Sequence, residues 1–123
     1  MTNLVSTKQI IVCDDDRDIR QFLSILLEEA GYEALIAADM YDVRHLLKFE
    51  HPRAILLDIC MPELDGFEIA DCLHNRAESI PIIFMTAYGD RFSRESSTRG
   101  AAGYFTKPLD TDALLKRIDD VIK

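Results

Sequence analysis

Short apolar runs alternate with helix-compatible segments along the chain. Ile10 to Cys13 form a continuous apolar run with β-branched members, which predicts a strand buried on both faces of a parallel sheet. Similar runs follow at residues 34–37, 54–57, 82–85 and 104–105. Because each run is followed by sequence that can form a helix, the pattern predicts five strand and helix pairs.

The first helix is expected from Arg17 to Ala30, with Gly31 at the position of a C-terminal cap. Its apolar residues, which recur at helical spacing, are Ile19, Phe22, Leu23, Leu26, Leu27 and Ala30. The other expected helices lie at residues 39–49, 66–75, 90–99 and 110–122. Several of them open with Asp, whose charge is favourable near the positive end of a helix.

The helix expected at residues 90–99 has the weakest pattern. Phe92 is its only large apolar residue. The indifferent helix formers in this segment are Ser93, Ser96, Ser97 and Thr98. We therefore expect local mobility there.

Strict alternation of strands and helices predicts an α/β fold, a single doubly wound (βα)₅ domain with right-handed crossovers and helices on both faces of a parallel sheet. A chain of 123 residues with 48% apolar composition is long enough for one hydrophobic core and short for two domains. We expect a short polar leader at residues 1–8 and one domain at residues 9–122. Ligand chemistry should gather at the carboxyl ends of the strands.

Composition narrows the classes of partner and compartment. The first apolar cluster is broken by polar residues 6–9, and no apolar stretch approaches bilayer length, so we expect neither a signal peptide nor a membrane partner. Cys13, Cys60 and Cys72 are odd in number and lack CxxC spacing, which favours buried thiols in a reducing cytoplasm. A net charge of −8 would repel a nucleic-acid backbone, so direct nucleic-acid binding is not expected.

Polar residues that follow the expected strands carry the candidate chemistry. These are Asp14 and Asp15 after the first strand, Asp58 after the third, Thr86 after the fourth and Lys107 after the fifth. Each has a simpler explanation: the aspartates could cap the first helix, Thr86 could close a turn, and Lys107 could be a solvated charge. Taken singly, these explanations are preferred.

Taken together, the same residues predict a cation site. Three carboxylates at one edge of a sheet repel one another and are tolerated only beside a cation and an ammonium group. Ligands that are all oxygen, with no His or Cys at these strand ends, favour Mg²⁺ (or Mn²⁺) over zinc. The three histidines, His45, His51 and His74, are expected at the surface.

The joint pattern closely resembles the receiver family of response regulators over about residues 9–122. The segments that carry the resemblance are Ile10-Ile11-Val12-Cys13-Asp14-Asp15-Asp16, Leu57-Asp58-Ile59-Cys60-Met61-Pro62 with Asp65-Gly66, Met85-Thr86-Ala87, and Lys107-Pro108. Each segment is weak alone, but their order, spacing and strand-end placement agree. The resemblance implies a flavodoxin-like sheet of strand order 2-1-3-4-5.

The resemblance also implies the chemistry of a phosphorylated switch. Asp58 would be the phosphoacceptor, a carboxylate nucleophile toward the phosphohistidine of a sensor histidine kinase or a histidine phosphotransfer protein, or toward a small phosphodonor. Mg²⁺ would be held by Asp15, Asp58 and the backbone carbonyl of Cys60, with Asp14 contributing through water. Lys107 and the metal would offset phosphoryl charge, so Lys107→Ala should impair switching at least as much as phosphorylation. The family typically has a cis peptide at the position of Lys107-Pro108.

In the family, the signal would pass from the phosphoryl group to a protein surface. The Thr86 hydroxyl would move toward the phosphoryl oxygens, and Tyr104, as the switch aromatic, would fill the vacated space. The alternative is that Tyr104 is a half-exposed aromatic with no switching role. Cys60 and Tyr88 flank the route of an attacking water, so a bulky Tyr88 would slow phosphate loss, although an exposed aromatic without kinetic effect is an equal alternative.

The expected readout surface is formed by the fourth helix, fifth strand and fifth helix. No turnover of a separate substrate is expected, so the chain is not predicted to be an enzyme in its own right. Its output would pass through a downstream protein or through an output domain outside these residues, which leaves open a stand-alone regulator or the receiver of a larger protein. A phosphorylation-dependent dimer is compatible with the resemblance, but no particular residue here indicates it.

Three rival interpretations are disfavoured by the same residues. A phosphatase of the haloacid dehalogenase type would use the Asp-x-Asp spacing in residues 14–16, but the chain has no cap segment and Asp58 has no role in it. A flavodoxin would place a phosphate where three aspartates repel it. A receiver-like module that is never phosphorylated is disfavoured because all the residues named above at strand ends are present.

Overall fold

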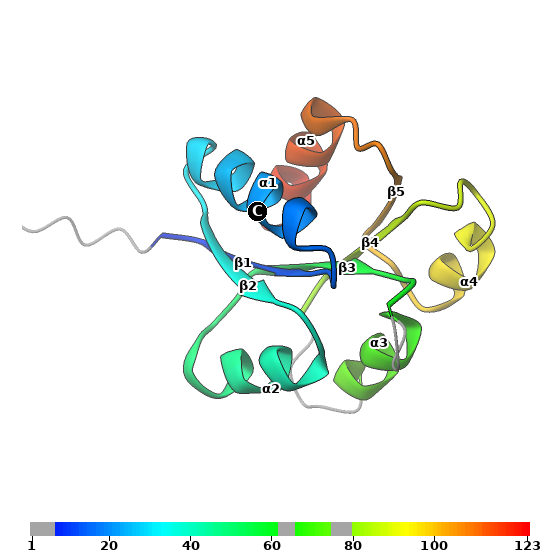
Figure 1. The fold of residues 1–123 in the computed structure, drawn as a ribbon, viewed down its shortest axis with the longest axis horizontal. Coiled ribbons are helices and arrows are strands. Elements are labelled where there is room, and N and C mark those ends of the chain that lie inside the picture. The colour runs from blue at the N-terminus through cyan, green and yellow to red at the C-terminus, as the bar shows by residue number, and fades with distance from the viewer. Residues whose placement is uncertain (1–6, 62–65, 75–79) are drawn as a thin grey trace, which may run out of the picture.

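Five parallel strands form one sheet, and helices cover both of its faces (Figure 1). The computed structural model describes residues 7–61, 66–74 and 80–123. The strands are β1 (Gln9–Cys13), β2 (Glu33–Ala37), β3 (Ala54–Asp58), β4 (Ile82–Thr86) and β5 (Gly103–Thr106). The helices are α1 (Arg17–Glu29), α2 (Met40–Phe49), α3 (Gly66–His74), α4 (Ser93–Thr98) and α5 (Thr111–Val121).

The strand order is β2-β1-β3-β4-β5, which confirms the flavodoxin-like (βα)₅ prediction. Several predicted features lie outside the described residues: most of the leader (1–6), the motif residues Pro62 and Asp65, and Asn75 at the end of the third expected helix. None of the helices in the described ranges is both long and apolar enough to cross a membrane.

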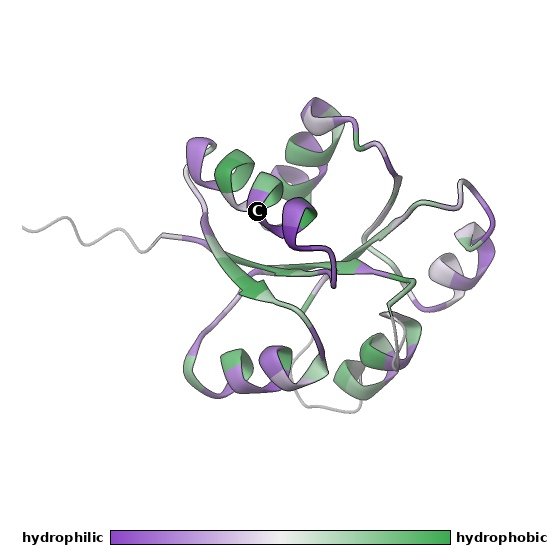
Figure 2. Cartoon of the chain, viewed as in Figure 1, coloured by the Kyte–Doolittle hydropathy of each residue, from purple (hydrophilic) through white to green (hydrophobic). Residues whose placement is uncertain are grey.

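The core consists of one apolar cluster on each face of the sheet. On one face, α1 and α5 contribute residues such as Leu23 and Leu114; on the other, α2 and α3 contribute residues such as Val43 and Ile69. The central strands β1, β3 and β4 are buried almost throughout, whereas the edge strands β2 and β5 are only partly buried. In Figure 2 the strands are largely apolar, and the helices around them carry both apolar and polar segments. Burial on both faces explains why the central strands read as continuous apolar runs.

Aspartate side chains begin three of the helices, as the sequence predicted. Asp16, Asp39 and Asp110 each accept a hydrogen bond from a backbone N–H in the first turn of α1, α2 and α5. At the other end of α1, Gly31 has a φ of 95° and Tyr32 donates to the carbonyl of Leu27. This arrangement confirms Gly31 as the C-terminal cap.

Two details of the prediction were wrong, namely the extent of the fourth helix and the burial of all three cysteines. The fourth helix spans six residues from Ser93, because residues 89–92 form turns and Phe92 has no capping side chain. Phe22, one of the helically spaced apolar residues of α1, is 48% exposed because Leu23 and Leu27 occupy the inner face. Of the cysteines, only Cys13 is buried, since the other two lie partly exposed in the loop after β3 and on α3. His45 and His51 are exposed as expected, whereas the side chain of His74 lies outside the described part of the chain.

The first residue of α3 lies directly against the end of β3. The N–H of Gly66 donates to the carbonyl of Ile59 at 2.7 Å. A Cβ atom at residue 66 would clash with the Asp58 carbonyl oxygen and would lie only 2.8 Å from the Cα of Ile59. Both neighbours are backbone atoms, so a side chain could be accepted only if α3 moved away from the sheet.

We therefore expect Gly66→Ala to destabilise the protein by about 3 kcal/mol, at the upper end of the usual range for overpacking. Gly100→Ala is the matched control: Gly100 has a φ of 71°, and a Cβ atom there would meet no atom within 4 Å, so only backbone strain of about 1 kcal/mol should arise. Urea unfolding of both variants measures the difference. Equal losses for the two would show that α3 is not held against β3 as described.

Candidate functional site

The sheet brings the predicted polar residues to one edge. Cys13 pairs with Leu57 across β1 and β3, so Asp14 follows one strand beside Asp58 at the end of the next. Oxygen atoms of Asp14, Asp15 and Asp58 all lie within 4.8 Å of one another. Lys107 reaches the same cluster from the end of β5, with its ammonium on Asp14. These side chains from distant parts of the sequence therefore converge, as predicted.

Asp14 is fully buried and is held by contacts of both its side chain and its backbone. Its carboxylate accepts the N–H of Asp16 at 2.9 Å and the ammonium of Lys107 at 2.8 Å. Its backbone carbonyl accepts the guanidinium of Arg20 at 2.8 Å, and its N–H donates to the carbonyl of Ala37 at 3.1 Å. A carboxylate fixed in this way cannot turn away from its neighbours.

Asp58 occupies the end of β3 and is 4% exposed. One carboxylate oxygen accepts the N–H of Cys60 at 3.3 Å, and the other lies 3.7 Å from the ammonium of Lys107. Burial and the adjacent charge of Asp14 raise the pKa of Asp58 to about 6, although Lys107 and the Cys60 N–H oppose the shift. Asp58 is therefore a carboxylate near neutral pH, but one whose negative charge is insufficiently compensated.

Lys107 supplies a positive charge inside the cluster. Burial lowers its pKa, but the hydrogen bond to Asp14 and the charges of Asp14 and Asp58 outweigh burial, so the net shift of the Lys107 pKa is upward. The ammonium stays protonated and is not the solvated surface charge considered above. The Lys107–Pro108 peptide bond is cis, as the resemblance implied.

The donor set fits a hard divalent cation. Asp14, Asp15 and Asp58 offer carboxylate oxygens within one small volume, and the first and third are buried while Asp15 is exposed. Beneath them, burial and then the charge of Asp14 raise the pKa of the Cys13 thiol to about 12, so Cys13 offers no thiolate. Oxygen ligands without sulfur or imidazole are those preferred by Mg²⁺.

Two of the simpler explanations hold for individual residues. Asp16 caps α1 by accepting the N–H of Asp18 at 2.9 Å, so the aspartate run divides between a cap and the acidic cluster. The Thr86 hydroxyl accepts the N–H of Tyr88 at 3.1 Å and so closes a turn. Thr86 also lies beside Lys107, whose N–H donates to its carbonyl at 2.7 Å.

Tyr104 connects β5 to the loop before α4. Its hydroxyl donates to the carbonyl of Gly89 at 2.6 Å and accepts the N–H of Phe92 at 3.2 Å. Tyr88 is 55% exposed, and its ring meets that of Phe92 edge-on with centroids 6.4 Å apart. The loop between β4 and α4 is thus held through the Tyr104 hydroxyl.

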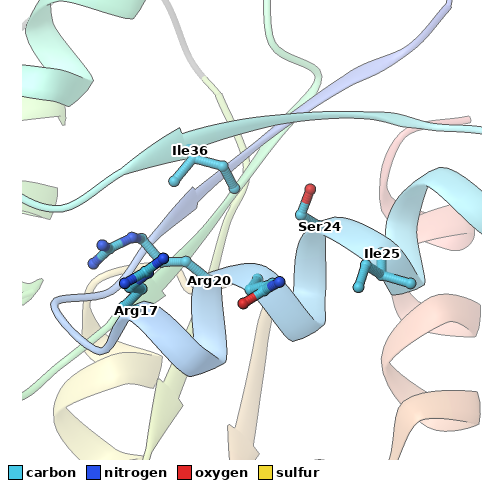
Figure 3. A pocket seen from close by; sticks show the side chains of 6 residues that line it. Arg17, Arg20, Ser24, Ile25 and Ile36 are labelled. Carbon is cyan, nitrogen blue, oxygen red and sulfur yellow. The ribbon is translucent and has the colours of Figure 1, made fainter.

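Sequence patterns did not reveal Arg20, which binds the backbone of Asp14. Arg20 also lines a groove of about 350 Å³ between α1 and β2, with Arg17 and Ile36 among its walls (Figure 3). The two arginine heads lie toward one end of this groove, and Ser24 and Ile25 lie toward the other (Figure 3). The described residues that line it include no carboxylate, so it is separate in chemistry from the acidic cluster.

Comparison with known proteins agrees with this geometry. The family model of the response regulator receiver domain matches residues 10–119. The chain belongs to this family. This receiver domain is 38% identical to a probable transcriptional regulator, ycf27, of Cyanophora paradoxa over 97% of the chain and 50% of the relative. It is 33% identical to the response regulator MprA of Mycolicibacterium vanbaalenii over 94% of the chain and 50% of the relative.

The solved structures of similar fold include other receiver domains. A Francisella response regulator receiver domain superposes with a TM-score of 0.86 at 28% identity, covering 94% of this chain and 97% of that one. A CheY-like receiver domain protein of Methanospirillum hungatei gives a TM-score of 0.86 at 30% identity, covering 95% and 94%. The receiver domain spans about half the length of several of the curated relatives it matches. Proteins of this family interact with histidine kinases and with output domains.

The raised pKa of Asp58 predicts a pH-dependent effect on stability. Because the pKa is higher in the folded state than the ordinary value of 3.8, the folded protein holds the proton more tightly between about pH 4 and pH 6. The contribution of Asp58 to stability is therefore lost as the pH rises through this window. Above it, the ionised buried group destabilises the fold by on the order of 2 to 3 kcal/mol.

Asp58→Asn should accordingly raise the free energy of unfolding at pH 7 in metal-free buffer by on the order of 2 kcal/mol. The difference between variant and wild type should shrink toward zero as the pH falls to about 4, where the wild-type carboxyl is also largely neutral. Asp15→Asn, which changes an exposed member of the cluster, is the control and should have a smaller effect. A variant no more stable than wild type at pH 7 would contradict the charge balance described here.

Proposed function

We propose that this receiver domain is the phosphoacceptor switch of a two-component or phosphorelay system, with Asp58 as the residue that becomes phosphorylated. The observation that carries the proposal is the position of Asp58: a buried carboxylate beside Asp14 and Asp15 and 3.7 Å from the ammonium of Lys107. The phosphodonor would be the phosphohistidine of a sensor histidine kinase or histidine phosphotransfer protein, or a small acyl phosphate.

The transfer needs little covalent chemistry from the protein. A carboxylate oxygen of Asp58 attacks phosphorus and an O–P bond forms, while the P–N bond to the donor imidazole breaks with its electron pair going to nitrogen. The donor histidine is released neutral because the ring either carries a proton on its other nitrogen beforehand or takes one from solvent. Lys107, already within the cluster, can contact a phosphoryl oxygen without a large movement of its backbone. Catalysis is then mainly the placement of positive charge near the phosphoryl oxygens.

Asp15, Asp58 and the backbone carbonyl of Cys60 would hold Mg²⁺ (or Mn²⁺), with Asp14 contributing through water. The excess of carboxylates over ammonium groups in the cluster supports this assignment. When bound, the metal supplies further positive charge toward the phosphoryl oxygens. Asp14 is already paired with Lys107 at 2.8 Å, which fits a role in the outer part of the site.

The readout would begin at Thr86. Its hydroxyl accepts a hydrogen bond from Tyr88, so its own proton is available to a phosphoryl oxygen once one is present. A shift of Thr86 would move the loop that Tyr104 holds at Gly89 and Phe92. The surface of α4, β5 and α5 would then change, and a partner protein or an output domain would detect the change.

Several further properties follow from this proposal. The domain, at residues 9–122, would act in the cytoplasm on its own phosphorylation and dephosphorylation, without turnover of a separate substrate. With a net charge of −8 it would not bind nucleic acid directly. Cys60 and Tyr88 would modulate phosphate lifetime, because both lie in loops beside the acceptor, and a phosphorylation-dependent dimer would use the readout surface.

Incubation with acetyl phosphate and Mg²⁺ should add one phosphoryl group to the protein, detected as an increase in intact mass. Without Mg²⁺ the adduct should be absent, because the positive charge that offsets the phosphoryl group is then lost. In Asp58→Asn it should also be absent, because the acceptor oxygen is lost. Asp16→Asn, which alters the α1 cap outside the acceptor site, is the control and should retain the adduct. A folded wild-type protein that gains no mass would instead indicate a module that works without phosphorylation.

A further inference from the structure

The helix α4 is weakly fixed by its own contacts. It spans only six residues and has no side-chain cap at its N-terminal end. Its buried residue is Ser96, whose hydroxyl has no hydrogen-bond partner among the residues that the structure describes. A buried hydroxyl without a partner stabilises nothing, so the position of α4 depends on contacts at its two ends.

The N-terminal end is held by Tyr104, as described above, whereas the C-terminal end is held by Arg99. The guanidinium of Arg99 contacts both carboxylate oxygens of Asp71 in α3, with Nε 3.1 Å from Oδ1 and Nη2 3.4 Å from Oδ2. The same guanidinium lies over the ring of Phe67, 4.4 Å from its centroid. Arg99 therefore joins the end of α4 to two residues of α3, the helix beside it in Figure 1.

Phe67 in turn lies next to the proposed acceptor. It follows Gly66, which has no room for a side chain against the backbone of Asp58 and Ile59. The Phe67 ring packs edge-on against Phe84 of β4 and Phe92 before α4, with centroids 5.1 Å and 5.9 Å apart. Movement of the backbone after Asp58 would therefore displace Phe67 and, through it, Arg99.

We infer that Arg99 is a positioning residue that gives the Asp58 site a second connection to α4, through α3 and separate from the route of Thr86 and Tyr104. This inference rests on the proposed function, since it assigns a path for the same signal. An exposed ion pair alone stabilises little. Here the bidentate contact and the aromatic ring together fix one orientation of the guanidinium, so α3 and α4 are coupled in geometry.

The side-chain chemistry separates this role from simple charge pairing. A lysine at position 99 would keep the positive charge near Asp71 but could not make the bidentate contact and stack its plane on Phe67 at once. Arg99→Lys should therefore give a partial effect, and Arg99→Gln the full effect. Arg94→Gln is the matched control, because Arg94 is an exposed arginine of the same helix without an ion pair in the described structure.

The experiment compares hydrogen exchange of the α4 amides with and without acetyl phosphate and Mg²⁺, with phosphorylation of each protein measured by mass. In Arg99→Gln the ratio of exchange rates between the two states should fall about fivefold, which corresponds to ~1 kcal/mol of coupling. Arg94→Gln should keep the wild-type ratio. Tyr104→Phe removes the other hydrogen-bonded connection. In the double variant of Arg99→Gln and Tyr104→Phe, the fold reductions of the exchange ratio should multiply if the two routes are independent.

The outcomes distinguish the inference from the function on which it rests. If Arg99 only stabilises α4, exchange in Arg99→Gln will rise equally in both states, the ratio will not change, and the inference is overturned. If the wild-type protein takes up no phosphoryl group, the proposed function fails and the inference fails with it. If Arg99→Gln is too unstable to measure, Arg99→Lys decides the question, because an unchanged ratio in that folded variant also overturns the second connection.

Discussion

Crowding of like charges at the carboxyl edge of the sheet constrains the rest of the structure. Asp14 and Asp58 are both buried beside Asp15, and Lys107 is the ammonium that contacts them. Such an arrangement is unfavourable without additional positive charge: burial, and after it the charge of Asp14, raises the pKa of Asp58. The same excess of negative charge favours binding of a divalent cation. It also destabilises the fold at the place where the proposed chemistry occurs.

The neighbouring backbone is organised to keep those charges in place. Asp14 is fixed through its carboxylate, carbonyl and N–H, and Gly66 allows α3 to begin against the chain that follows Asp58. The site is therefore rigid on the side of β1 and β3. On the side of β4 and β5 it is connected to a short helix with one buried hydroxyl that has no partner in the described part of the chain. A firmly bonded acceptor beside a short helix with few contacts of its own suits the proposed switch, because a small local change could alter such a helix at low energetic cost.

Contacts at the two ends of α4 give this arrangement its specificity. Tyr104 holds the preceding loop through one hydroxyl, and Arg99 holds the following end through Asp71 and Phe67. Tyr104 lies on β5, the strand that leads to Lys107, and the partners of Arg99 lie on α3, which begins against the backbone that follows Asp58. The position of α4 thus reflects the state of its neighbours more than its own helix propensity, which is low.

The sequence by itself determined the order of strands and helices, the parallel sheet and the residues that meet at its edge. It could do so because burial on both faces leaves continuous apolar runs, and parallel strands end at one edge. Only the tertiary structure decided which neighbours those residues have: that Asp16 caps α1 while Asp14 pairs with Lys107, that Arg20 binds the Asp14 carbonyl, and that Arg99 spans α3 and α4. These contacts join residues of different helices and strands that are close in space, and neither periodicity nor composition shows which residues become neighbours. The start of α4 was misjudged for the same reason, since packing against neighbours, and not local pattern, sets where a helix begins. Packing also decides which apolar residues of a helix are buried, as the exposed Phe22 shows.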